Sequence, residues 1–350
     1  MAFERNLLLI GLVLALLAPL IAYNEYALHI GVMIMFSVML ATSFNLIVGY
    51  VGEFPLGHTA FFGIGAYTSA LLSMRFGLPF YGAILASAVV AAVFGLAIGG
   101  VTLRLRGPFF VIVTLCFAEV LRLIANNWVG LTNGPMGLSG IAKPAWIVNA
   151  GGVEQKLWFY YTGLLLASIS LLISYRFVYS NIGRAAVAVR ENRFVAQSVG
   201  IWPFYLGLIT FVLAAAISGL AGGFYAYYIS YVGPEVFGFS FMITMIIMVL
   251  AGGKGTLVGP VVGAVIVVFL EEYLRDFKDL RFSIFGLIVI AVVIFLPRGL
   301  MGFVARRREI YSSRGNGDSD KVVRETIEPD LKARILNNKA LDGQGSVSDA

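Results

Sequence analysis

Long apolar segments recur along almost the whole length of this chain. As helices, runs of about 17 to 25 apolar residues can cross the roughly 30 Å hydrocarbon core of a bilayer. A soluble fold cannot bury ten such segments, since 59% of the 350 residues are hydrophobic and only 13% are charged. We therefore predict an all-α polytopic membrane protein with about ten transmembrane helices, at approximately 7–23, 28–50, 57–74, 80–103, 109–128, 157–178, 204–230, 237–252, 257–274 and 282–303.

Three of these segments carry the glycines and prolines that are typical of irregular backbone. The third begins in the stretch GYVGEFPLGH, and the eighth and ninth are separated only by GGKGT. Irregular backbone is tolerated at membrane depth only where protein or a water-filled cavity covers it. Each of these three segments is therefore a candidate for a partly re-entrant structure.

The charged residues divide the chain into a transmembrane domain, 1–304, and a polar tail, 305–350. The tail holds 17 of the 44 Lys, Arg, Asp and Glu side chains, and its low hydrophobicity predicts a mostly disordered cytoplasmic segment. With ten spans both termini share one side of the membrane. Loops on that side carry twelve Lys and Arg against seven on the other, so the positive-inside rule predicts cytoplasmic N- and C-termini.

Composition also excludes several classes of protein. A body with so few charges is neither a cytosolic enzyme nor a nucleic-acid binder, although the net charge is +6. The single cysteine, Cys116, cannot form a disulfide within the chain, and its apolar surroundings predict a small core residue. The aromatic series from Phe224 to Tyr231 ends the seventh span and predicts a belt at the membrane interface.

The cytoplasmic loop 180–203 has the pattern of a helix outside the membrane. Small apolar residues recur at helical spacing from 184 to 199 between charged ones, and Gly200 and Pro203 then stop the helix. Such a helix either lies on lipid headgroups or docks on a soluble partner. Its Ala and Val favour docking, because helices on membrane surfaces typically present Trp, Leu and Phe. The candidate docking residues are Arg184, Ala188, Arg190, Glu191, Arg193, Ala196 and Gly200.

The loop sequence GRAAVAVRENRFVAQSVGI resembles the coupling loop of ABC importer permeases of the branched-chain amino-acid type, in the LivM-like branch. Three further stretches agree in the same order: GYVGEFPLGHTAFFGIGAY (49–67), TLCFAEVLRLIANNWVGLTNGPMGL (114–138) and GGKGTLVGPVVGA (252–264). The resemblance covers about residues 28 to 303. Lys254 departs from it, since the family is expected to have an apolar residue there.

This resemblance implies a type II ABC importer-like permease in the bacterial inner membrane, with no cofactor and no ATPase site of its own. The implied partners are a second, LivH-like permease, two cytoplasmic ATP-binding subunits that hold ATP and magnesium, and a periplasmic substrate-binding protein. Its implied substrates are branched-chain or related neutral amino acids. Two alternatives remain open: an ABC permease for urea or other amides, and a self-contained ion-coupled carrier in which Glu119 and His58 form a proton relay.

Short motifs do not point to catalysis. GGKGT lacks the Ser or Thr that must directly follow the lysine of a phosphate loop. GLSG (137–140) resembles the nucleophile motif of rhomboid-type proteases, but no predicted span begins at Ser139. The two histidines, His29 and His58, form no metal-spaced cluster in the sequence.

Ionisable residues at membrane depth are costly and are therefore candidates for the translocation pathway. Glu119 lies near the middle of the fifth span, with Arg122 one turn later. The pair either faces the substrate or the partner permease, or it fixes helix packing. Glu53 and His58 flank the broken backbone before the third span; they either line the pathway or satisfy that backbone, and Asn45 is a weaker candidate of the same kind.

Small residues around GGKGT are expected where two helices approach closely, because small residues four apart let backbones meet. The glycines in this pattern are Gly252, Gly255, Gly259 and Gly263. In the external loop 129–156, a turn-rich element from Thr132 to Gly137 is a candidate contact for the periplasmic binding protein, or it is simply a turn.

Overall fold

A computed structural model of the chain describes residues 2–21, 23–105, 107–148 and 151–277, with short pieces at 284, 286–287 and 299–301. Contacts divide the chain into a first unit, Met1–Met301, and a second, Gly302–Ala350. The second unit lies outside the described residues, and so do the predicted disorder of the polar tail and most of the predicted span 282–303.

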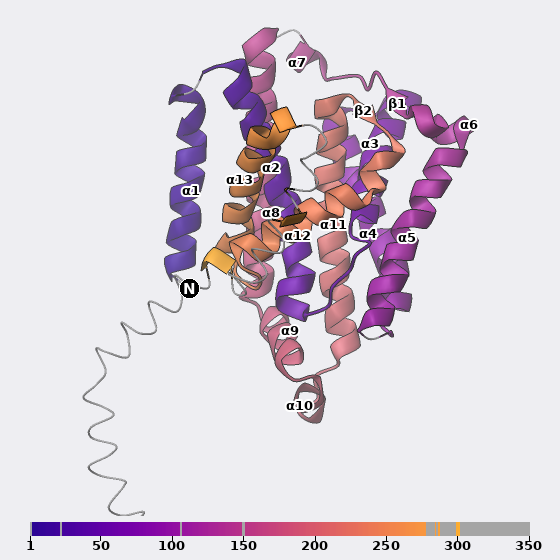
Figure 1. Cartoon of the computed structure of the whole chain (residues 1–350), viewed down its shortest axis with the longest axis vertical. Helices are drawn as coiled ribbons and strands as arrows, with labels where there is room; N and C mark the ends of the chain where they lie inside the picture. Colours follow the sequence, from indigo (N-terminus) through magenta and orange to yellow (C-terminus); the bar gives the residue numbers. More distant parts are fainter. Residues whose placement is uncertain are drawn as a thin grey trace, which may run out of the picture. The chain divides into compact units, whose positions relative to one another are not determined.

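Nine helices of the described residues coincide with the first nine predicted spans (Figure 1). By length and composition, five helical stretches in this part of the chain are able to cross a membrane: 25–51, 80–102, 108–127, 152–178 and 203–229. The nine helices are α1 (Ala2–Ile21), α2 (Glu25–Asn45), α3 (Thr59–Phe76), α4 (Phe80–Thr102), α5 (Pro108–Asn127), α8 (Gly152–Val178), α11 (Pro203–Ile229), α12 (Phe239–Gly252) and α13 (Val258–Tyr273).

Short elements mark the two ends of this bundle (Figure 1). We call them the α9 end and the α6 end. At the α9 end lie α9 (Asn181–Glu191), α10 (Arg193–Ser198) and the π-helical continuation of α2, η1 (Leu46–Val51). At the α6 end lie α6 (Val129–Thr132), η2 (Gly134–Met136), α7 (Ala145–Val148) and η4 (Leu274–Phe277). Strand β1 (Leu138–Ser139) pairs antiparallel with β2 (Tyr231–Val232), which leads into the 3-10 turn η3 (Pro234–Phe237).

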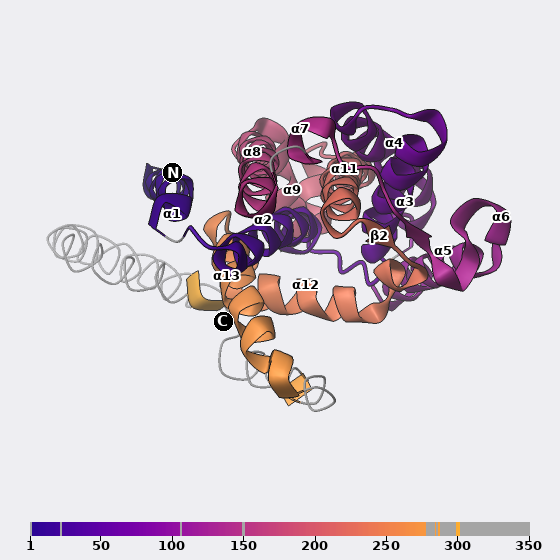
Figure 2. The same ribbon diagram turned by 90° about the horizontal axis from the view of Figure 1, so that it is seen from above.

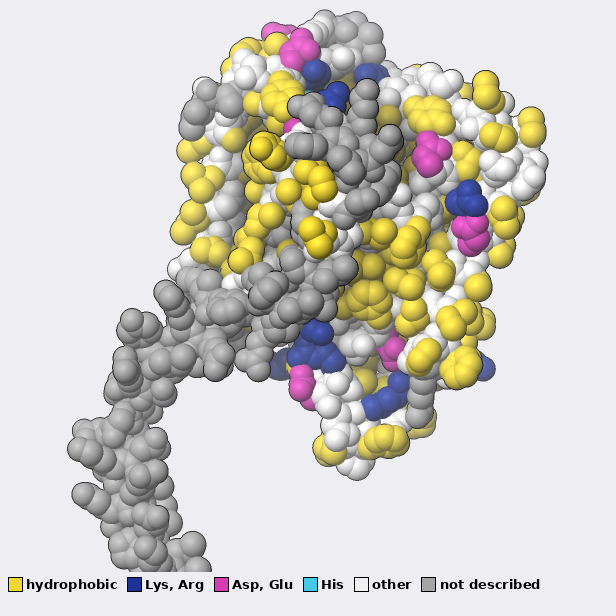
Figure 3. Space-filling model, viewed as in Figure 1, with side chains coloured by type: hydrophobic (Ala, Val, Ile, Leu, Met, Phe, Trp, Pro, Cys, Tyr) yellow, Lys and Arg dark blue, Asp and Glu magenta, His cyan; other side chains and the backbone are white. Residues whose placement is uncertain are grey.

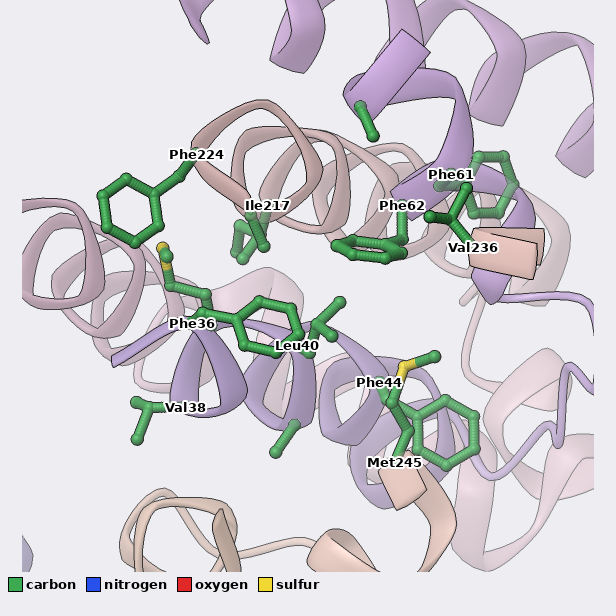
Figure 4. Packing of buried hydrophobic residues seen from close by; sticks show 14 of the residues in the cluster. Phe36, Val38, Leu40, Phe44, Phe61, Phe62, Ile217, Phe224, Val236 and Met245 are labelled. Carbon is green, nitrogen blue, oxygen red and sulfur yellow. The ribbon is translucent and has the colours of Figure 1, made fainter. Parts of the chain in front are cut away.

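The core is built around α11, which packs against α3 and α4 and also contacts α2 and α8. Small residues allow this close packing: a Cβ at Gly65 or Gly222 would overlap the backbone of the facing helix. Figure 4 shows Phe36 and Leu40 of α2 pointing toward Phe62 of α3 and Ile217 of α11. Helix α11 therefore joins α3 and α4 to α2 and α8.

The central position of α11 corrects the prediction of an interfacial aromatic belt for two of its five rings. Phe224 and Tyr227 are only 0% and 1% exposed. The Tyr227 ring packs edge-on against Phe80 of α4 with centroids 4.8 Å apart, and the Tyr228 hydroxyl lies 2.6 Å from Nδ1 of His29 in α2. Neighbouring helices leave Phe224 and Tyr227 no access to an interface, while the other three rings of the series are only partly buried.

Cys116 also differs from its prediction, because it is exposed on α5. The buried residues of α5 are Phe110, Thr114, Ala118 and Ala125, which follow one helical face. Cys116 lies on another face. An apolar run in a membrane protein need not be a core segment, since a face turned to lipid or to another subunit is equally apolar.

Helix α3 differs from the other long helices in its starting point, and helix α12 differs from them in its direction. The Phe61 ring, at the start of α3, packs on Phe211 at 5.3 Å between centroids. Phe211 is eight residues into α11, so α3 begins roughly 12 Å inside the bundle at 1.5 Å per residue. Helix α12 is strongly inclined: Figure 2 shows α8 and α11 nearly end-on and α12 along its length.

Candidate functional site

The first re-entrant turn is the segment 52–58, which returns the chain from η1 into the bundle. Gly52 ends the π-helix with a φ of +84°, a left-handed conformation that favours glycine. Gly57 lies so close to α5 that a Cβ would overlap the carbonyl oxygen of Thr114. His58 is completely buried, and its Nε2 lies 2.9 Å from Oγ of Ser43 in α2. His58 therefore joins the turn to α2.

A second re-entrant turn, 231–238, approaches from the opposite end of the bundle and meets the first. The Thr59 hydroxyl donates a hydrogen bond of 3.1 Å to the carbonyl oxygen of Phe237. The Phe237 ring stacks on Tyr67 with 5.7 Å between centroids. Tyr231 is the first residue of this turn. Burial raises the pKa of its hydroxyl, and so does the nearby carboxylate of Glu235, which accepts a hydrogen bond from that hydroxyl.

The two turns share a sequence pattern that our sequence analysis missed. Residues 50–59 read YVGEFPLGHT and residues 231–240 read YVGPEVFGFS, so both follow YVG, four residues, Gly, any residue, then Thr or Ser. Each copy lies at the end of a helical stretch of 27 residues: the first begins within the last two residues of 25–51, and the second begins two residues after 203–229. The first stretch ends at the α9 end and the second at the α6 end (Figure 1). Repeats of opposite direction are a recurrent basis of transporter folds.

The predicted single helix of loop 180–203 is in fact two helices, which corrects that prediction. Helix α9 ends at Glu191, and the side chain of Asn192 then accepts hydrogen bonds of 3.1 Å from the backbone N–H groups of Phe194 and Val195. Asn is among the best N-cap residues, so it starts a new helix, α10, instead of continuing the old one.

The two helices present different faces to the bundle and to the outside. Ala186, Val189 and Ala196 are buried against the membrane helices. Ala188, Gly200 and Arg184 are exposed, and Arg184 bonds to Asn181 of its own helix. On α10 and just after it, large apolar side chains are exposed: Phe194 by 74%, Val195 by 59% and Val199 by 70%. Figure 3 shows hydrophobic side chains at the tip over α10, with Lys and Arg side chains nearby.

Arg190 and Arg193 turn back toward the bundle. Arg190 donates a hydrogen bond from Nη1 to the carbonyl oxygen of Gly49 in η1, and its other nitrogens bond to Glu191. Arg193 forms an ion pair of 3.8 Å with Glu53, in the first re-entrant turn. The structure thus brings four of the predicted residues together, from a loop and a turn far apart in the sequence.

Asn45 connects α2 to the turn between α12 and α13. It is 1% exposed, donates 2.9 Å from Nδ2 to the carbonyl oxygen of Thr256, and accepts 2.9 Å at Oδ1 from the N–H of Gly255. Gly255 has a φ of +78° and lies in this turn, not in a helix contact. Gly252, Gly259 and Gly263 lie where α12 and α13 touch, since a Cβ on any of them would overlap the facing backbone.

Glu119 and Arg122 form an ion pair on the exposed surface of α5. The closest N···O distance is 2.5 Å, and the side chains are 50% and 40% exposed. Their partners are each other, while His58 bonds to Ser43, so the structure does not join Glu119 and His58 into a relay.

An apolar cavity of about 620 Å³ lies between α2, the end of α11, α12 and α13. Its polar groups include Ser240, Thr244 and Glu271, and the Thr244 hydroxyl donates 3.1 Å to Oε1 of Glu271. None of the predicted pathway residues lines it. In the sequence, the second copy of the YVG pattern runs into the start of α12, which forms one wall of this cavity.

The helical fold and its apolar exterior define a multi-pass membrane protein. The chain belongs to the family described as the permease component of the branched-chain amino acid transport system, whose model matches residues 26–297. It is 30% identical to the permease protein LivM of Salmonella typhimurium over 336 residues, which cover 90% of this chain and 79% of that protein. LivM of Escherichia coli K12 is 29% identical with the same coverage.

The permease protein LivH is also similar to this chain. LivH of Salmonella typhimurium is 25% identical over 291 residues, which cover 75% of this chain and 90% of that protein. No solved structure shows significant similarity to the chain.

Proposed function

We propose that this chain is one of two membrane-spanning subunits of an ATP-binding cassette importer for branched-chain or related neutral amino acids. Membership of the permease family supports the subunit class. The similarity to both LivM and LivH supports a second subunit of the same fold as its partner in the membrane. Both subunits would then contribute to translocation.

The α9 end is proposed to face the cytoplasm, with both termini. Loop 180–203 at this end is rich in arginine, in keeping with the positive-inside rule. Helix α1 begins at this end, since Glu4 accepts a hydrogen bond of 2.8 Å from Tyr179. Helix α13 reaches the α6 end, where Glu272 accepts one of 3.0 Å from Tyr26. A tenth span at 282–303 would return the chain to the cytoplasm.

The exposed apolar side chains on α10 and just after it carry the proposal that this loop docks on an ATP-binding subunit. Phe194, Val195 and Val199 lie on an element outside the membrane helices, where water would otherwise cover them. Exposed apolar groups rimmed by charges mark interaction sites. The ATP-binding subunits would hold ATP and magnesium, and this chain would need no cofactor.

The cavity beside α12 suits a small hydrophobic amino acid. Its walls are mostly aliphatic and aromatic, and hydroxyl groups of Ser240 and Thr244 offer polar contacts. A periplasmic binding protein would deliver the substrate at the α6 end, where the loop 129–156 and the second re-entrant turn meet in the β1–β2 pair. ATP-driven movement of the docking loop would then open the pathway inward.

Copurification of the assembled complex tests this function. The double variant Val195→Asp/Val199→Asp places two charges on the docking surface and should lose the ATP-binding subunits while remaining in the membrane. Tyr205→Asn, which alters an exposed apolar side chain outside the docking helices, should leave them bound. In proteoliposomes, leucine uptake should need the partner subunits, ATP and the binding protein. Uptake by this chain alone under an ion gradient would identify a carrier instead.

A further inference from the structure

Three elements of the α9 end meet at the side chain of Arg190. Its guanidinium donates a hydrogen bond to the carbonyl oxygen of Gly49. This oxygen is near the end of η1, where carbonyl groups lack a partner within the helix. Its aliphatic stem lies against Gly52, where a Cβ would be 2.7 Å from Cγ of Arg190. The same guanidinium borders the α12–α13 turn, since a Cβ on Gly255 would lie 2.9 Å from Nη1. One side chain thus touches η1, the first re-entrant turn and the α12–α13 turn.

Asn45, the last residue of α2 and the one directly before η1, holds the α12–α13 turn. Its two hydrogen bonds hold the turn at Gly255 and Thr256 on α2, and Thr256 accepts from the Gly259 N–H at 3.0 Å to start α13. A displacement of η1 would therefore move the α12–α13 turn with it. Helix α12 borders the apolar cavity, so this turn is the cytoplasmic-side support of a wall of the proposed pathway.

The docking loop meets the bundle through both apolar packing and polar contacts. Helix α9 contacts η1, α8 and α11, with Ala186 and Val189 buried. Beside this packing lies a cavity of about 240 Å³, whose lining includes Arg190 and Arg193. Two directional polar contacts join the loop to η1 and to the first re-entrant turn: the Arg190 hydrogen bond to Gly49 and the ion pair of Arg193 with Glu53.

We propose that Arg190 is a positioning residue that transmits movement of the docking loop to η1 and the α12–α13 turn. The inference rests on the proposed function, because it takes α9 and α10 to be the element that the ATP-binding subunits move. Arginine suits this role because its planar fork holds several acceptors in a fixed geometry, whereas lysine offers a single point charge. Arg193 provides the second connection, to the first re-entrant turn.

The test measures the α12–α13 turn directly in the assembled complex. Lys254 is exposed in this turn, so Lys254→Cys in a Cys116→Ala background gives this chain a single cysteine, whose labelling is followed in the band of this subunit after electrophoresis. With wild-type Arg190, ATP with vanadate should change the maleimide labelling rate at position 254 at least threefold. With Arg190→Gln that change should vanish, and with Arg190→Lys it should be reduced. Arg104→Gln is the matched control, because Arg104 is at the same end and its guanidinium lies over the Phe204 ring, 5.7 Å from the ring centroid.

Transport per ATP gives the second readout. If Arg190 transmits the movement, Arg190→Gln should keep its ATP-binding subunits and hydrolyse ATP, but import at least tenfold less leucine per ATP. A role in folding alone would lower the amount of complex without changing this ratio. An unchanged labelling response or ratio in Arg190→Gln would overturn the inference. Failure of the proposed function would be distinct, since Val195→Asp/Val199→Asp would then still copurify with the ATP-binding subunits.

Discussion

The hydroxyl of Thr59 donates a hydrogen bond to the carbonyl oxygen of Phe237, 178 residues further along the chain. This bond joins two re-entrant turns that approach from opposite ends of the bundle. Phe62, three residues after Thr59, packs on Phe241 with 5.3 Å between ring centroids. The starts of α3 and α12 are thus tied together, so a displacement of either start strains the other.

Removing this hydrogen bond should destabilise the protein modestly. Thr59→Val keeps the shape of the side chain but leaves the buried Phe237 carbonyl without this donor, at a cost of about 1 kcal/mol. The apparent Tm in detergent should fall, while Thr59→Ser, which keeps a hydroxyl, should stay close to the wild type. Equal Tm values for Thr59→Val and the wild type would show that the turns are held by packing alone.

A side chain at Gly57 should prevent folding. Its Cβ would overlap the Thr114 carbonyl oxygen, and neither backbone can move without displacing α5 or the first re-entrant turn. We expect Gly57→Ala to cost more than about 3 kcal/mol, beyond the usual range of point variants. Gly130→Ala is the control, because a Cβ at Gly130 would have no atom of the described residues within 4 Å. The yield of monodisperse protein in detergent measures both.

Some features of the site follow from local rules and others do not. The break at Asn192 was within reach of the sequence, because Asn followed by a short apolar stretch is an N-cap pattern. The second re-entrant turn was also within reach, through the repeated YVG and Gly spacing at 50–57 and 231–238. Neither signal appears in the hydrophobicity or the helical period of the residues, which were the patterns that predicted the spans.

The inward contacts of the docking loop could not be derived in this way. Gly49 and Arg190 are 141 residues apart, and their pairing depends on a π-helix whose carbonyl faces the loop. The burial of residues in apolar runs could not be derived either. Cys116 and Tyr227 both lie in such runs, yet Cys116 is exposed and Tyr227 is buried. In a membrane protein, hydropathy separates helices from loops but does not distinguish the core from the lipid-facing surface.

Loss of the α10 cap should weaken docking without affecting the bundle. Asn192→Ala removes the acceptor for the Phe194 and Val195 N–H groups and should cost about 1 kcal/mol of local helix stability. The affinity for the ATP-binding subunits should fall several-fold while the apparent Tm of the membrane unit stays constant. Asn192→Asp retains the cap and should bind normally. A large drop in Tm for Asn192→Ala would mean that α10 supports the bundle itself.

The Glu119–Arg122 ion pair allows a test of whether two opposite charges stabilise each other on the apolar surface of α5. Each side chain compensates the other through a bidentate contact, so the pair is tolerated where one unpaired charge would not be. Arg122→Leu and Glu119→Leu should each lower the amount of folded protein in the membrane, because each leaves one charge without its partner.

The double variant Glu119→Leu/Arg122→Leu should restore that amount, since it leaves no charge to compensate. Membrane levels and the apparent Tm of the four proteins complete a double-mutant cycle. With folding restored, leucine uptake by the assembled complex then separates the two roles that the sequence left open. The exposed position of both side chains, away from the cavity beside α12, leads us to expect uptake close to the wild-type level. Strong loss of uptake in the folded double variant would instead place the pair on the pathway or at the contact with the second permease.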